Sequence, residues 1–305
     1  MALQERDAYI EGAGLRLFAR VVGEGPPVVL LHGFPENGYS WRHQVPALAA
    51  AGFSAWAPHL RGYPPSDVSP RRADYHLRHL VDDVAAIVAA TGYPRATIVG
   101  HDWGGIIAWA FAAAYPALLD KLVILNAPHM DIFRDKVWRT SQLFRSSYIG
   151  FFQLPFLPES VLAAGNFFTI RQMFKFTPAR WGTFRDLEIT QYLESLSQPG
   201  ALKAALDYYR ANMSLAGMEL ARRARTNAAV LVIWGMRDPA LGAFLLQGLE
   251  KYAPRVRIHA IPQAGHWVQN EAPDEVNRAL LAFLGKPSRA SVVVPGAEQG
   301  GATTP

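Results

Sequence analysis

The stretch Gly100-His101-Asp102-Trp103-Gly104-Gly105 decides the local fold of this chain and the side chain that it presents. It follows a β-branched run, residues 96–99, and precedes an apolar stretch, residues 106–115, that is typical of a buried helix. A strand, a glycine-rich turn and a helix form a nucleophile elbow, in which small residues allow a sharp turn that lifts one side chain into a pocket. Asp102 stands where the usual G-x-S-x-G pattern has its serine. The same residue could also serve only as a helix N-cap.

Strand-like runs alternate with helix-length segments around the elbow. The expected strands cover residues 16–22, 27–31, 54–57, 96–99, 121–125, 229–234 and 255–261, and the expected helices cover residues 41–50, 75–90, 105–114, 242–252 and 273–284. Several strands are continuous apolar runs, as in parallel strands that are covered on both faces. The alternation predicts an α/β fold with a mostly parallel sheet.

Composition narrows the class of protein. Half of the 305 residues are hydrophobic and 18% are charged, which suits a compact enzyme. The net charge is +5, but the basic residues are scattered singly or in pairs, so no nucleic-acid partner is expected. The absence of cysteine excludes disulfides, cysteine nucleophiles and thiolate metal sites.

The sequence shows no pattern typical of a signal peptide at its start or of a membrane span. The polar start, residues 1–7, lacks the apolar core of a signal peptide. The longest apolar stretch, residues 106–119, is too short for a membrane span and is interrupted by Pro116. We therefore expect a soluble, cytoplasmic protein with no membrane partner.

The alternation of strands and helices stops between Leu125 and Ala229. These residues contain no convincing strand but much aromatic and helical character, which indicates a helical lid inserted between two strands. Most of its aromatic side chains are expected to pack within the lid. The predicted organisation is a first core segment at 1–128, a helical cap at 129–226, a second core segment at 227–285 and a disordered tail at 286–305.

A carboxylate at the elbow attacks a carbon centre and forms an ester with it, and this ester must then be hydrolysed. That step requires a base, a group that orients the base, and donors that stabilise an oxyanion. His266, which follows the last expected strand, is the candidate base, and Asp238, which follows the preceding strand, is the candidate orienting acid. The order Asp102, Asp238, His266 is that of nucleophile, acid and histidine in α/β-hydrolases. Taken singly, Asp238 could only start a turn and His266 could be an ordinary loop histidine.

Backbone N–H groups supply the candidate oxyanion site. The segment His32-Gly33-Phe34-Pro35-Glu36 ends an earlier strand, and its N–H near Phe34, with that of Trp103, could bind an oxyanion. A simple β-turn is the alternative interpretation of this segment. His76 and His79 have metal-like spacing, but no third ligand is evident, so we expect no metal site.

The chain resembles the epoxide hydrolase family of the α/β-hydrolases over residues 9–284. The resemblance rests on five segments: HGFPE at 32–36, Ser40-Trp41-Arg42, Arg61-Gly62-Tyr63, GHDWGG at 100–105 and GHW at 265–267. It implies an eight-stranded, mostly parallel sheet flanked by helices, with an inserted helical cap. It also implies conversion of a small hydrophobic epoxide and water to a vicinal diol, without metal or organic cofactor, by a monomer or homodimer.

The resemblance extends to the tyrosines that such enzymes carry in the lid. A family tyrosine lies ahead of a Phe-Gln-x-Pro segment, which matches residues 147–155 and selects Tyr148. The second precedes an arginine, and in Tyr208-Tyr209-Arg210-Ala211-Asn212 it aligns better with Tyr209 than with Tyr208. Both would hydrogen-bond the epoxide oxygen. The implied pocket is formed by His32, Pro35, Trp103, Phe152 and Trp267.

Two departures and three alternatives accompany this interpretation. His59 and the segment Pro64-Pro65-Ser66-Asp67 replace the usual Asp before Leu-Arg-Gly-Tyr and the Gly-Asp-Ser after it, so altered loop packing or pocket shape is expected. A haloalkane dehalogenase would also use Asp102, although Phe34 stands where its second halide donor is often Asn. A catalytically silent binder of hydrophobic ligands is a second alternative. A serine esterase is disfavoured because no serine occupies the elbow.

Overall fold

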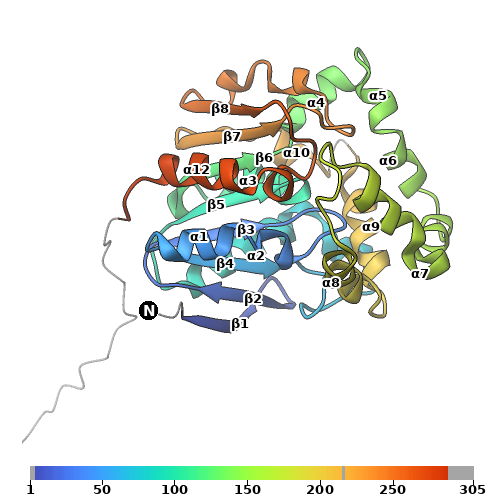
Figure 1. Cartoon of the computed structure of the whole chain (residues 1–305), viewed down its shortest axis with the longest axis horizontal. Helices are drawn as coiled ribbons and strands as arrows, with labels where there is room; N and C mark the ends of the chain where they lie inside the picture. Colours follow the sequence, from blue (N-terminus) through green and yellow to red (C-terminus); the bar gives the residue numbers. More distant parts are fainter. Residues whose placement is uncertain (1–3, 215–216, 288–305) are drawn as a thin grey trace, which may run out of the picture.

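A central eight-stranded sheet organises the structure, a computed structural model that describes residues 4–214 and 217–287 (Figure 1). The strand order is β1-β2-β4-β3-β5-β6-β7-β8. The bounds are β1 Glu5–Glu11, β2 Arg16–Val22, β3 Pro27–Leu31, β4 Ser54–His59, β5 Ala96–His101, β6 Leu119–Leu125, β7 Ala229–Gly235 and β8 Val256–Ile261. Strand β2 is antiparallel to β1 and β4, and the other neighbours are parallel. The predicted eight-stranded, mostly parallel sheet is confirmed.

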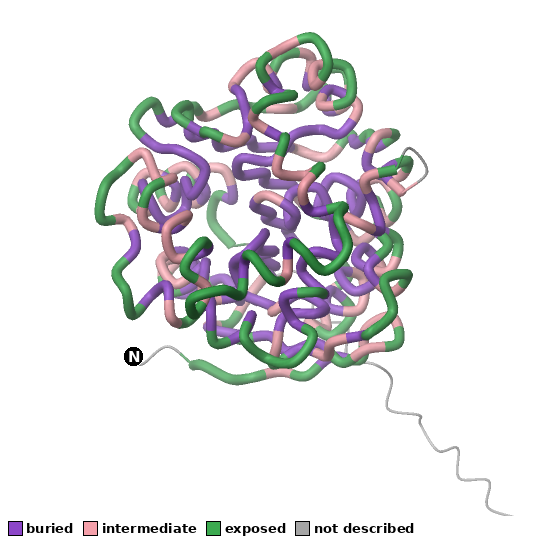
Figure 2. The backbone as a smooth tube through the Cα atoms, turned by 90° about the vertical axis from the view of Figure 1, so that its right-hand side faces the viewer, coloured by how far each residue is buried: buried purple, intermediate pink, exposed green. Residues whose placement is uncertain are grey.

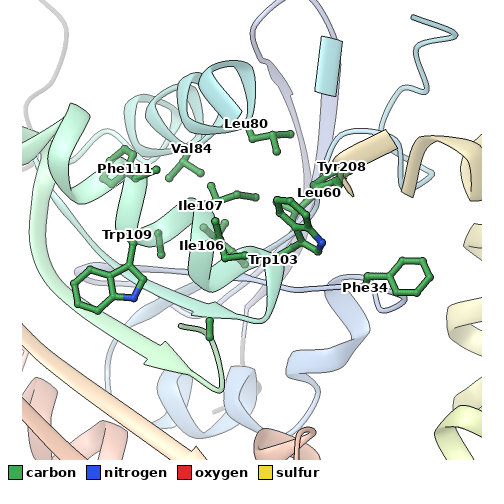
Figure 3. Packing of buried hydrophobic residues seen from close by; sticks show 14 of the residues in the cluster. Phe34, Leu60, Leu80, Val84, Trp103, Ile106, Ile107, Trp109, Phe111 and Tyr208 are labelled. Atoms are coloured by element: carbon green, nitrogen blue, oxygen red, sulfur yellow. The ribbon is translucent and has the colours of Figure 1, made fainter. Parts of the chain in front are cut away.

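Both faces of the sheet are covered by helices, which explains the continuous apolar strands. In β3, Val28 and Leu30 pack in one core cluster while Val29 and Leu31 pack in another. The first cluster includes residues of α1 (Gln44–Ala50) and α12 (Pro273–Leu284), and the second includes residues of α2 (Leu77–Ala90) and α3 (Trp103–Ala114). Figure 3 shows Ile107 of α3 pointing toward Leu80 and Val84 of α2.

Seven helices fill the stretch between β6 and β7 and confirm the inserted helical cap. They are α4 Met130–Val137, α5 Gln142–Arg145, α6 Ser147–Phe152, α7 Leu157–Phe176, α8 Asp186–Leu196, α9 Ala201–Asn212 and α10 Glu219–Arg222. Helices α5, α6 and α7 form the outer right side of the molecule in Figure 1. Helix α7 is interrupted at residues 164–167, where Gly165, Asn166 and Phe167 have positive φ.

The remaining elements are short. They comprise α11 Val268–Glu271 and the 3-10 turns η1 Gly38–Trp41, η2 Arg72–Tyr75, η3 Pro116–Leu118, η4 Ala243–Leu246 and η5 Leu249–Lys251. The predicted helix at 242–252 is therefore wrong: Gly248, at φ 89°, separates two 3-10 turns there. Strand β1 was not expected from the sequence, because only Ile10 of its residues is buried. Among the helices of the described residues, none is both long and apolar enough to cross a membrane. The predicted disordered tail lies, apart from residues 286 and 287, outside the described residues.

Candidate active site

The turn between β5 and α3 places Asp102 in an uncommon backbone conformation, with φ 51° and ψ −120°. Close packing around this turn requires glycine on either side. A Cβ on Gly104 would lie 2.1 Å from the carbonyl oxygen of Leu31, and one on Gly100 would lie 2.2 Å from that of Gly104. The glycines therefore let strand and helix approach closely enough to hold the carboxylate of Asp102 at the sheet edge.

The structure brings the three triad candidates together. His266 Nδ1 lies 2.8 Å from Asp238 Oδ2, and His266 Nε2 lies 3.7 Å from Asp102 Oδ2. Each residue follows the carboxyl end of a strand, namely β5, β7 or β8. Parallel strands deliver these ends to one edge of the sheet, which is why residues far apart in sequence meet there.

Asp238 is fixed by donors that the sequence interpretation missed. Asn126, which follows β6, donates its side-chain N–H to Asp238 Oδ2 at 2.7 Å and accepts the N–H of Gly235 at 2.8 Å. The N–H groups of Ala240 and Leu241 donate to Asp238 Oδ1. Burial alone would raise the pKa of Asp238, but the charge of His266 and these hydrogen bonds lower it.

His266 is a charged group in its resting surroundings. Burial would lower its pKa, but the carboxylate of Asp238, with which it shares a hydrogen bond, and then the charge of Asp102 raise the pKa to about 9. The imidazole is therefore protonated at neutral pH. Loss of the Asp102 charge would lower that pKa.

The loop after β3 brings a backbone donor to Asp102. The N–H of Phe34 donates to Asp102 Oδ1 at 3.0 Å. Gly33 permits this approach, because a Cβ there would lie 2.4 Å from the Asp102 side chain. The N–H group that the sequence suggests as an oxyanion donor near Phe34 therefore binds one oxygen of the Asp102 carboxylate.

A buried histidine and glutamate, also missed from the sequence, support the loop that carries His266. His101 Nε2 lies 2.8 Å from the backbone oxygen of His266, and His101 Nδ1 lies 2.9 Å from Glu36 Oε2. Because a carbonyl oxygen only accepts, Nε2 of His101 carries a proton. Glu36 is fully buried and is also contacted by the side-chain amides of Gln269 and Asn270. His101, next to Asp102 in the elbow, and Glu36, in the loop that carries Phe34, thus connect both segments to the loop that carries His266.

Two cap helices place Tyr148 and Tyr209 close to each other and to the elbow. Tyr148 lies on α6 and Tyr209 on α9, with ring centroids 6.2 Å apart. The Tyr209 ring packs edge-on against Trp103 at 5.1 Å and against Phe152 at 5.0 Å. Burial and the nearby charge of Asp102 raise the pKa of Tyr148, and burial raises that of Tyr209, so both hydroxyls keep their protons.

The hydroxyl of the neighbouring Tyr208 is hydrogen-bonded to the protein backbone. Its hydroxyl donates to the backbone oxygen of Arg61 at 2.8 Å, and its ring packs against those of Tyr63, Tyr75 and Trp103. Figure 3 shows Tyr208, Trp103 and Phe34 around the start of α3. The hydroxyl of Tyr208 is thus committed to the backbone, whereas Tyr209 lies against Phe34, whose N–H binds Asp102.

Arg210 and Asn212, which follow Tyr209 in the pattern Tyr-Arg-Ala-Asn, connect α9 to neighbouring segments. Arg210 donates to the backbone oxygens of Phe152 and Leu154 and forms an ion pair with Glu159, which ties α9 to α6 and α7. Asn212 accepts the N–H of Leu77 at the start of α2 and donates to the backbone oxygen of Tyr75. Arg210 thereby aligns the two cap tyrosines, and Asn212 fixes α9 to the core.

The remaining expected pocket residues differ in their surroundings. His32 uses both ring nitrogens on the backbone: its Nε2 accepts the N–H of Leu60 and its Nδ1 donates to Gly33 O. Burial lowers its pKa to about 3, so it stays neutral. Phe152 packs against Phe34 at 5.5 Å, beside the tyrosines. Pro35 follows Phe34 through a cis peptide bond.

Trp267 anchors the loop that bears His266. Its indole N–H donates to the hydroxyl of Thr177, and its ring lies 5.0 Å from that of His266. Glu271 accepts the N–H groups of Gly265, Trp267 and Ala179, so one buried carboxylate orders both this loop and the cap segment beside it. No signal in the sequence singled out Glu271.

Three of the residues that depart from the family pattern, His59, Pro64 and Pro65, line a cavity of about 810 Å³ beside α1. His59 Nδ1 donates to the backbone oxygen of Pro64 at 2.8 Å, and the hydroxyl of Ser66 donates to the backbone oxygen of His59. None of Asp102, Asp238, His266, Tyr148 and Tyr209 lines this cavity. Across residues 4–214 and 217–287, no group of three or more His, Asp and Glu side chains is arranged to hold a metal ion.

The charge on His266 yields a testable titration. We expect the imidazole of His266 to titrate near pH 9 by NMR, and its pKa to fall in Asp238→Asn, which removes the charge that raises it. Since the folded pKa exceeds the ordinary value, the associated stability is complete below about pH 6.5 and is lost as the pH rises through about 9. A His266→Gln variant assigns the signal, and an unchanged pKa in Asp238→Asn would contradict the coupling.

Comparison with known proteins places the chain in a family. The model of the alpha/beta hydrolase fold family matches residues 26–273. The AB hydrolase superfamily protein YfhM of Bacillus subtilis is 33% identical over 90% of this chain and 96% of its own length. Epoxide hydrolase 3 of Xenopus tropicalis is 36% identical over 90% of this chain and 76% of its own length. The structure of epoxide hydrolase A from Mycobacterium thermoresistibile, at 30% identity, has a TM-score of 0.82 and covers 94% of this chain and 100% of that one. The chain therefore belongs to the epoxide hydrolase family of the α/β-hydrolase fold.

Proposed function

We propose that this protein hydrolyses a small, hydrophobic epoxide to the vicinal diol through a covalent ester on Asp102. One observation carries the proposal: the elbow carboxylate lies near two protonated cap tyrosines and near a histidine that is paired with a second carboxylate. Relatives that are named epoxide hydrolases support the reaction class. The rings of Phe34, Phe152 and Trp103 beside the tyrosines favour an apolar substrate.

The two oxygens of Asp102 have different surroundings and therefore different roles. Oδ1 accepts the N–H of Phe34, whereas Oδ2 lies on the side of His266. Oδ2 attacks an epoxide carbon and forms the ester bond, while the broken C–O bond leaves its electron pair on the epoxide oxygen. Tyr148 and Tyr209 donate hydrogen bonds to that oxygen and supply its proton. Oδ1 becomes the ester carbonyl oxygen.

Ester formation changes the state of His266. The ester has no charge, so one of the carboxylates that raise the pKa of His266 is removed. The imidazolium then releases a proton, which replaces the one that the tyrosines gave to the alkoxide. Neutral His266, oriented by Asp238, becomes a base only after the first step has taken place.

Hydrolysis of the ester returns the site to its starting state. His266 takes a proton from water, and the water oxygen attacks the ester carbonyl carbon. The N–H of Phe34 and the N–H of Trp103, which lacks an intrahelical partner at the first position of α3, stabilise the negative charge on Oδ1. The C–O bond to the substrate then breaks, and the leaving alkoxide takes the proton of the carboxyl group that forms on Asp102. The diol leaves, and the Asp102 carboxylate and protonated His266 are restored.

The nucleophile is tested by product analysis with a panel of aryl and alkyl epoxides and matched haloalkanes. We expect diol from the epoxides, and a loss of turnover on the order of 10⁴-fold or more in Asp102→Ala, because the covalent route is removed. Asp135→Ala, an exposed aspartate on α4, is the matched control and should keep wild-type turnover. Halide release without diol formation would instead assign the protein as a dehalogenase.

The tyrosines are tested by removing single oxygen atoms. We expect Tyr148→Phe/Tyr209→Phe to lower kcat by about 10²–10⁴-fold, since ring opening loses its acid. Tyr208→Phe removes an equally buried hydroxyl that donates to Arg61, and its kcat should stay within a few-fold of wild type. The melting temperature of each variant separates folding from catalysis. Equal losses in Tyr208→Phe and in the double variant would refute the assignment.

A further inference from the structure

The outer wall of the cap leaves an unusual number of large apolar side chains in solvent. Fourteen such side chains are exposed in the described part of the chain, and eleven of them fall within residues 138–187. They are Trp138, Leu143, Phe144, Leu154, Phe156, Leu157, Val161, Phe168, Phe176, Trp181 and Leu187. Phe144, Phe156 and Trp181 are each at least 80% exposed. Most lid aromatics are buried or packed against the core, as expected from the sequence, but the aromatic side chains in this group are largely exposed.

The same segment carries most of the net charge of the protein. Residues 138–187 contain six basic and two acidic side chains, a net charge of +4 against +5 for the whole chain. Both acidic groups form ion pairs, Glu159 with Arg210 and Asp186 with Lys175. Two further basic side chains pair with carboxylates outside the segment, Arg139 with Asp135 and Arg185 with Glu188. We call the eleven apolar and six basic side chains the cap surface.

The cap surface runs from the end of α4 to the start of α8. Most of its residues lie on or beside α5, α6 and α7, the helices on the right side of Figure 1, or on the loop that follows α7. Figure 2 looks onto that side, where exposed stretches cross the face toward the viewer. Tyr148 and Phe152 of α6 pack inward against Tyr209, while Phe144 before this helix and Phe156 after it are exposed.

We propose that the cap surface docks the protein on the interface of an anionic lipid membrane without spanning it. Aromatic and leucine side chains together with arginine and lysine are the composition of interfacial binding, in which apolar groups enter the headgroup region and cations attract anionic lipids. Charge selects this partner over a second copy of the chain, because two cap surfaces face to face would bring an excess of positive charge against another. The docking does not depend on the catalytic assignments.

Tryptophan fluorescence reports on this surface selectively. Of the eight tryptophans, only Trp138 and Trp181 are exposed, and both lie on the cap surface; the other six are at most 2% exposed. We expect phosphatidylcholine vesicles that contain phosphatidylglycerol to shift the emission to shorter wavelength, and brominated lipids to quench it. The shift should be much smaller with pure phosphatidylcholine and should weaken at high salt.

Matched triple variants distinguish binding by the cap surface from non-specific binding by any exposed apolar side chain. We expect Phe144→Ser/Phe156→Ser/Trp181→Ser to lower partitioning onto anionic vesicles, measured by co-sedimentation, by about tenfold or more. The control Tyr9→Ser/Met236→Ser/Ile258→Ser changes the three exposed apolar residues outside the cap surface and should stay within about twofold of wild type. Circular dichroism checks that both variants are folded.

Charge is tested separately with Arg139→Gln/Arg171→Gln. Each removed cation should lower partitioning about fivefold, with no effect on pure phosphatidylcholine. Absence of vesicle binding by the wild-type protein, or equal losses in the two triple variants, would overturn the proposal. Light scattering that shows a dimer dissociated by the cap triple variant, without vesicle binding, would assign the surface to a second copy of the chain.

Discussion

The positive-φ backbone at Asp102 is the constraint on which the rest of the site depends. A single residue with φ 51° between β5 and α3 turns the chain, and the packing of Gly100 and Gly104 leaves no room for a Cβ on either side. The turn fixes Asp102 at the sheet edge, where the N–H of Phe34 and the imidazole of His266 reach different oxygens. One bend of the backbone therefore sets where the proposed nucleophile meets the proposed oxyanion donor and base.

The chain could be assigned to its fold from sequence because its strands and catalytic loops have local signals. Apolar strands, a glycine-rich elbow and polar residues after strand ends predict the sheet, and parallel strands then bring Asp102, Asp238 and His266 to one edge. The choice of Tyr209 over Tyr208 came from the arginine that follows it. The structure places the two hydroxyls differently: that of Tyr208 donates to the backbone of Arg61, whereas Tyr209 packs beside Trp103.

The features that sequence could not supply depend on distant contacts or on the absence of burial. Asn126 and Glu271 act through residues far along the chain, so no local pattern marks them. Strand β1 is held by pairing with β2 and has one buried side chain, which leaves no apolar alternation to detect. Composition likewise cannot tell an aromatic residue that packs from one that faces solvent. Which cap aromatics are exposed is seen only in the structure. Sequence patterns can indicate a membrane-spanning helix, but they do not reveal a folded surface that contacts a membrane.

The covalent ester on Asp102 is the central claim, and a single turnover in ¹⁸O-labelled water tests it most directly. With enzyme in excess over epoxide, water attacks the ester carbonyl, so the label should enter the carboxylate of Asp102, and the diol should receive an unlabelled oxygen from the protein. Mass spectrometry of the peptide that contains Asp102 and of the diol measures both. Label in the diol, with none in the peptide, would show that water attacks the epoxide directly and would contradict the role of Asp102 as nucleophile.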